Sequence, residues 1–173
     1  MKNEREANER VARAMKPREL AELMAGKMKS IIEAGEEALP VCLIHRKDTD
    51  EIGVFGFEFD DEHSKDMAAN AMRLINKMPQ VDYLVFLCDA WWASIKTSDM
   101  KNVDLSQGVR NVPDRQEAIV ASIYTKLEVP EMGYWIYAHH NGQVKFTEKM
   151  EWMSCDHAEG RFVPPSPSIK SVQ

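Results

Sequence analysis

The sequence predicts an α+β domain in which a mostly antiparallel sheet of five or six strands carries helices packed on one face. Apolar residues recur at helical spacing in the first part of the 173-residue chain, whereas later segments show the short runs and alternation of strands. The dipeptide Asn141-Gly142, between two alternating runs, adds a strong hairpin signal. Taken along the chain, these signals give the element order ααββαββββ.

Two helices are expected before the first strand. Residues 1–16 contain oppositely charged pairs four positions apart but only a thin apolar stripe, so they predict a peripheral N-terminal helix. Pro17 suits the first turn of a second helix, because its missing N–H is not needed there. The apolar face of that helix runs through Ala34, and Gly35 is the expected stop.

Strand-like patterning then replaces the helical spacing. Two strands are expected over 41–45 and 52–59, joined by a polar connector of hairpin length. Asp60 and Asp61 can cap a third helix, which Pro79 terminates.

The segment 81–94 is too apolar for a surface strand and predicts the centre of the sheet. We expect Val85, Phe86 and Leu87 to be almost fully buried, because a central strand covered on both faces has no solvent-facing side. Asp89 interrupts this run and therefore looks like a buried acid.

The second half of the chain begins with a long connection. Residues 96–112 are polar and aperiodic, which is typical of a functional loop or a disordered one. Residues 115–127 fit either a helix or a strand, and their β-branched and aromatic content favours the strand. Residues 133–152 predict a hairpin with a two-residue type I′ turn. One α+β domain over 17–153 is therefore expected, followed by a flexible proline-rich tail over 154–173.

This order, a helix, a strand hairpin, a second helix and then a strand meander, resembles the layout of the roadblock and profilin-like folds. The resemblance concerns the order of elements alone. It implies a fold, and it implies nothing about function.

Composition limits the possible partners. The net charge is −6, and residues 36–160 alone hold twelve basic and twenty-two acidic side chains. Such an acidic body repels phosphate, so nucleic acid is an unlikely partner. No apolar run is long enough to span a membrane, and three cysteines without a paired motif fit a reducing compartment. We therefore expect a cytoplasmic protein.

The common glycine-rich phosphate loops, zinc motifs and serine-hydrolase motifs are absent from the sequence. No cofactor is expected, and ligand spacing predicts no metal site. One constellation remains. If 81–94 and 115–127 pair across the long loop, Asp89 comes near Glu117 and Arg115, beneath the loop. Such a group could act as general acid and base or hold a divalent cation; a structural ion pair of Arg115 with Asp89 or Glu117 is the plainer alternative.

Trp91 and Trp92 are adjacent, so in a strand they point to opposite faces. Aromatic side chains are enriched in the cores of interfaces, which makes the two residues candidates for contact with a partner. The sequence thus predicts a non-enzymatic protein-interaction or accessory domain whose partner is a second copy or another protein. The alternative is a small metal-dependent hydrolase or nuclease using Asp89, Glu117 and Arg115.

Overall fold

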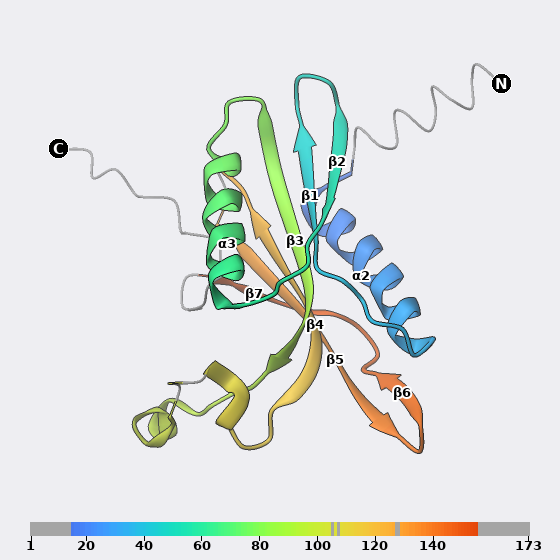
Figure 1. The fold of residues 1–173 in the computed structure, drawn as a ribbon, viewed down its shortest axis with the longest axis vertical. Coiled ribbons are helices and arrows are strands. Elements are labelled where there is room, and N and C mark those ends of the chain that lie inside the picture. The colour runs from blue at the N-terminus through green and yellow to red at the C-terminus, as the bar shows by residue number, and fades with distance from the viewer. Residues whose placement is uncertain (1–14, 105, 107, 127–128, 156–173) are drawn as a thin grey trace.

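The fold is a seven-stranded antiparallel sheet with helices on both faces (Figure 1). The computed structural model describes residues 15–104, 106, 108–126 and 129–155. The described elements are α2 (Pro17–Glu33), β1 (Val41–Arg46), β2 (Glu51–Gly56), α3 (Glu62–Asn76), β3 (Val81–Trp92), the 3-10 helices η1 (Thr97–Asn102) and η2 (Gly108–Asn111), β4 (Gln116–Tyr124), β5 (Glu131–His140), β6 (Gln143–Phe146) and β7 (Glu151–Ser154).

The strands run in the order β2-β1-β3-β4-β5-β6, and β7 also pairs with β5. The sheet has seven strands because 143–152, expected as one strand, divides into two. β6 pairs with the end of β5, from Tyr137 to His140, and β7 pairs with its beginning, from Glu131 to Tyr134. The interval between β6 and β7 leaves the ladder, so the two short strands share one side of β5.

The predicted hairpin turn is confirmed. Asn141 and Gly142 both have positive φ, 50° and 76°, and His140 pairs with Gln143. Positive φ at both central positions is the signature of a type I′ turn, whose twist matches that of the flanking strands.

The expected helix boundaries are also found. Pro17 occupies the first turn of α2, and the helix ends before Gly35, which has a φ of 78°. At the start of α3, the Asp61 side chain accepts a hydrogen bond from the backbone N–H of Ser64 at 2.7 Å. Asp61 is therefore the cap, and Asp60 precedes it.

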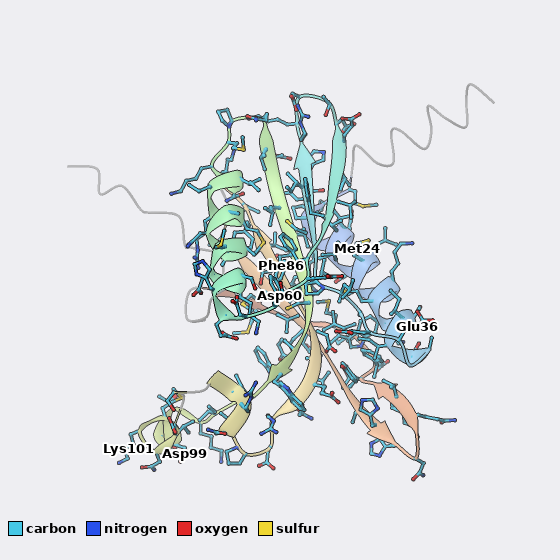
Figure 2. The ribbon with its side chains drawn as sticks, in the orientation of Figure 1. Met24, Glu36, Asp60, Phe86, Asp99 and Lys101 are labelled. Atoms are coloured by element: carbon cyan, nitrogen blue, oxygen red, sulfur yellow. The ribbon has the colours of Figure 1, made fainter. Side chains whose placement is uncertain are left out.

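The prediction that the helices pack on one face is wrong. α2 covers one face, where its apolar side chains pack against Leu43, Val85 and Leu87. α3 covers the opposite face, where Met72 packs with Leu84 and Phe86. Figure 1 shows the two helices on either side of the central strands, and Figure 2 labels Phe86 beside α3. Two layers are needed because the middle of β3 is apolar on both of its faces.

The core prediction for β3 is confirmed. Val85, Phe86 and Leu87 are all almost fully buried. The segment 115–127, which fitted a helix or a strand, forms β4 from Gln116 to Tyr124 and lies between β3 and β5. The favoured strand is thus the observed one.

The two ends of the chain fall largely outside the described residues, including the predicted helix over 1–16 and most of the predicted tail over 154–173. Ser154 ends β7, and Cys155 is buried with its N–H bonded to the Pro130 carbonyl at 2.9 Å. Among the described helices, none combines the length and the apolar character that a bilayer crossing requires.

Candidate functional site

The last residues of β3 and the first residues of β4 bring together side chains that the sequence singled out. Asp89 lies opposite Ile119, and Trp91 lies opposite Glu117, which in turn lies opposite Tyr137 on β5. Residues directly opposite one another share a face, and so do alternate residues along a strand. The side chains of Asp89, Trp91, Glu117 and Tyr137 therefore gather on the α2 side of the sheet.

Asp89 is bonded to Tyr137. The Tyr137 hydroxyl lies 2.8 and 2.9 Å from the two carboxylate oxygens. Tyr137 is buried, whereas Asp89 is exposed, so the expectation of a buried acid is wrong. Partial desolvation raises the pKa of Asp89, although the Tyr137 hydroxyl opposes this. Desolvation and the Asp89 carboxylate raise the pKa of Tyr137 strongly.

The predicted Asp89–Arg115 contact does not form. Because Asp89 pairs with Ile119, Arg115 lies four residues earlier in the chain, just before β4 begins, roughly 13 Å away at the rise of a strand. The Arg115 guanidinium instead lies over the Trp91 ring, 4.7 Å from its centroid, and donates to the Arg110 carbonyl. A cation held over an indole is an attractive contact, so Arg115 has a partner of its own.

Glu117 and Asp89 do come together. With Trp91 and Ala90 they line a hollow of about 100 Å³. The Glu117 carboxylate lies 3.3 Å from Nε2 of His139, so each acid has a neighbour from β5. The structure thus adds Tyr137 and His139 to the predicted residues. Their places follow from the β4–β5 register, which no local pattern of residues predicts.

The long loop was expected to cover this hollow, but it does not. Its first part, η1, has no buried residues and projects away from the end of β3 (Figure 1). Figure 2 shows Asp99 and Lys101 of η1 at the outer limit of this projection. The hollow is therefore shallow and open, and its carboxylates face solvent. Among the described residues, no three His, Cys, Asp or Glu side chains are grouped as metal ligands.

The two tryptophans point to opposite faces, as expected from their adjacency. Trp91 is 49% exposed beneath Arg115. Trp92 stacks on Tyr134, with ring centroids 4.1 Å apart and an interplanar angle of 12°. Ala90 and Ala118, paired side by side on the same face, leave the space in which these two rings meet.

A second candidate surface lies at the opposite end of the sheet order. β2 is the edge strand, and among the described strands only β1 pairs with it. Ile52, Val54 and Phe55 of β2 are 36%, 62% and 54% exposed. A groove of about 710 Å³ runs between β2 and the end of α3, with Phe55, Ile75 and Met78 among its apolar lining. This surface combines unpaired backbone with exposed apolar side chains.

The other edge of the sheet is of a different kind. β6 and β7 have four residues each and lie end to end along β5. The exposed side chains of β6 include Gln143 and Lys145. Short strands and a lysine are devices that protect an edge from pairing with another chain, and β2 has neither.

Comparison of the chain with protein-family models, with curated proteins and with solved structures finds no match.

Proposed function

We propose that the chain is a non-enzymatic protein-interaction domain that forms a homodimer through the β2 edge. The observation that carries this proposal is the exposure of apolar side chains on both faces of an unpaired edge strand. Val54 points to the α2 face and Phe55 to the α3 face, and more than half of each side chain is exposed. Fully burying one such side chain contributes about 1.5–3 kcal/mol.

Pairing of two β2 strands would give the unpaired backbone groups of the edge hydrogen-bond partners and would cover these side chains at the same time. Main-chain hydrogen bonds supply affinity in this mode of recognition, and the flanking side chains supply specificity. The groove beside α3 adds apolar area next to the strand, since Met78 is 43% exposed there. A two-fold axis closes such an assembly at two copies, because the same patch serves both partners.

Native mass spectrometry and light scattering of the full chain test this proposal. We expect a species of twice the 19.8 kDa chain mass over a micromolar range of concentration. Phe55→Glu should shift it to the monomer, because each copy would have to bury a charged carboxylate against the other. Leu23→Glu is the matched control, since Leu23 is 50% exposed on α2 and is not part of the β2 edge. A monomeric parent, or equal effects of the two variants, would refute the proposal.

The second candidate is a small metal-dependent hydrolase or nuclease. The observation in its favour is the hollow that Asp89 and Glu117 share. Against it, Arg115 is engaged by Trp91, and both carboxylates have partners on β5. A thermal shift on addition of Mg²⁺, Mn²⁺ or Zn²⁺ that Asp89→Asn abolishes would support this candidate. No shift in the parent would remove it.

Two finer features belong to the same proposal. We propose a roadblock- or profilin-like arrangement, supported by a strand hairpin followed by α3 and a meander of β3, β4 and β5. We also propose a cytoplasmic location. Three free cysteines support it, two of them buried and Cys88 partly so, as expected in a reducing compartment.

A further inference from the structure

Alternate residues of β2 direct their backbone N–H and C=O groups to opposite sides of the strand. The position of the bonded pairs with β1 therefore determines which backbone groups the open edge offers. The Phe57 N–H donates to the Pro40 carbonyl at 2.9 Å, one pair beyond Val41 and Gly56. In an antiparallel ladder, bonded and non-bonded pairs alternate. Gly53 and Phe55 therefore direct their backbone groups toward β1. Ile52, Val54 and Gly56 direct theirs toward the open side of the sheet.

We infer that two copies of the chain pair through β2 in an antiparallel register centred on Val54, an inference that rests on the homodimer proposed above. In this register Val54 lies opposite Val54 of the second copy, and Ile52 lies opposite Gly56. Each outward N–H and C=O of these three residues then meets a complementary group. Six backbone hydrogen bonds form, and every outward-directed residue of β2 is used.

The same register places Phe55 of each copy opposite Gly53 of the other. Gly53 has no side chain, and Phe55 lies on the same face of the strand. An aromatic ring packed over a cross-strand glycine covers backbone that would otherwise be exposed. Because the two-fold axis repeats this contact, both rings gain a partner.

Other registers complement the edge less well. A shift of the centre to Gly53 pairs Phe55 with Glu51 and leaves Gly56 opposite Asp50, which lies in the turn with a φ of 55°. A shift to Phe55 sets the two rings directly opposite each other and moves Ile52 beyond the end of the partner's strand. Centring on Val54 is thus the register that matches both the hydrogen bonds and the shapes of the side chains.

The groove beside α3 continues this surface. It includes Gly53 and Phe55 from β2, and Ile75 and Met78 from the end of α3 and the residues after it. The Phe55 ring of the second copy, lying over Gly53, would enter the groove at its β2 wall. The contact therefore extends from the strand onto α3, on one face of the joined sheets.

Thiol cross-linking of the full chain reports the register. Val54→Cys puts two cysteines at the two-fold axis, with Cα atoms about 5.5 Å apart in a bonded pair, within reach of a short thiol-to-thiol reagent. Ile52→Cys is the matched control, because its copies lie about 13 Å apart. Burial raises the pKa of both Cys42 and Cys88 to about 12, so these native thiols should contribute little background.

We expect covalent dimer from Val54→Cys alone, none from Ile52→Cys alone, and heterodimer when Ile52→Cys is mixed with Gly56→Cys. A Cβ at Gly56 meets no atom within 4 Å, so that variant should fold. A dimer by mass in which Val54→Cys does not cross-link would overturn the register and leave the proposed homodimer standing. A monomer at every concentration would overturn both.

A second variant tests the ring contact without a reagent. At Gly53, a Cβ would meet its nearest neighbour, the chain's own Phe55 ring, at 3.5 Å, which is ordinary contact. Gly53→Val should therefore leave the monomer folded but collide with Phe55 of the second copy. We expect at least a tenfold weaker dimer with an unchanged circular dichroism spectrum. Unchanged dimerisation would contradict the proposed packing.

Discussion

The hydroxyl of Tyr137 on β5 reaches across β4 to the carboxylate of Asp89 on β3, at 2.8 and 2.9 Å from its two oxygens. The bond fixes three strands to one another at the end of the sheet that the helices leave uncovered. It also acts on both pKa values, because the hydroxyl favours the charged form of Asp89 and the Asp89 carboxylate raises the pKa of Tyr137.

Tyr137→Phe should raise the pKa of Asp89 further above its ordinary value of 3.8, because desolvation persists while the hydrogen bond that favours the charged form is lost. A raised pKa means that the folded state binds the proton more tightly than the unfolded state. Its contribution to stability is therefore present at low pH and is lost as the pH rises through the folded pKa. Carboxyl-carbon NMR titration measures the shift. Asp48, whose carboxylate bonds to Arg46, should be unaffected; a lower Asp89 pKa in the variant would contradict the assignment.

Leu87→Ala should lower the free energy of unfolding by about 2–5 kcal/mol, because it leaves a cavity at a fully buried position in the centre of β3. Urea denaturation measures the change. Leu74→Ala is the control, since Leu74 is 65% exposed on α3 and should change stability by about 0.5 kcal/mol or less. Similar losses for the two variants would show that the layer assignment is wrong.

Gly142→Val should destabilise the fold by about 1–2 kcal/mol, because a β-branched side chain is forced into the left-handed region at a φ of 76°. Gly26→Ala in α2 provides the opposite case. A Cβ there meets nothing within 4 Å, and alanine favours a helix over glycine by about 1 kcal/mol. Thermal and urea unfolding should therefore both show a less stable protein for Gly142→Val and a more stable one for Gly26→Ala. A neutral Gly142→Val would argue against the turn.

Gly133→Ala should destabilise by about 1–3 kcal/mol through overpacking. A Cβ on this buried residue of β5 would lie 2.6 Å from the terminal methyl carbon of Met150 and 2.9 Å from the Trp152 ring. The methionine can move, but the indole is held by a 2.9 Å bond from its Nε1 to Glu22 of α2. Gly56→Ala, with open space around the new Cβ, should be close to neutral. Trp152 fluorescence, measured in a variant that lacks the other tryptophans, should report the displacement.

Local signals in the sequence were sufficient for the parts of the fold that depend on neighbouring residues. The turn at Asn141 and Gly142 is set by backbone sterics within two residues. The burial of Phe86 and Leu87 follows from an apolar run that leaves no side for solvent. The start of α3 at Asp61 depends on one side chain and one N–H three residues away.

Pairings across long separations were not predictable in this way. The sequence indicated that β3 and β4 are neighbours. A long segment of irregular structure separates them, so no local pattern specifies the register between the two strands. The expected proximity of Asp89 and Glu117 is found, since both line one hollow, but the residue directly opposite Glu117 is Trp91 and Asp89 is its diagonal neighbour. The single-face helix layer failed for a related reason. The apolar residues on both sides of β3 required two covering layers, yet no local pattern tells which helix takes which face.

The division of the β5 edge between β6 and β7 has a consequence for how the protein behaves at high concentration. Neither short strand offers more than four residues to an incoming chain, and they lie end to end along the strand that they cover. A sheet that can be extended from one side alone cannot propagate as a fibre. Once the β2 edges of two copies have met, further copies find no long template, so crowding should increase the fraction of dimer and leave the solution free of longer polymers.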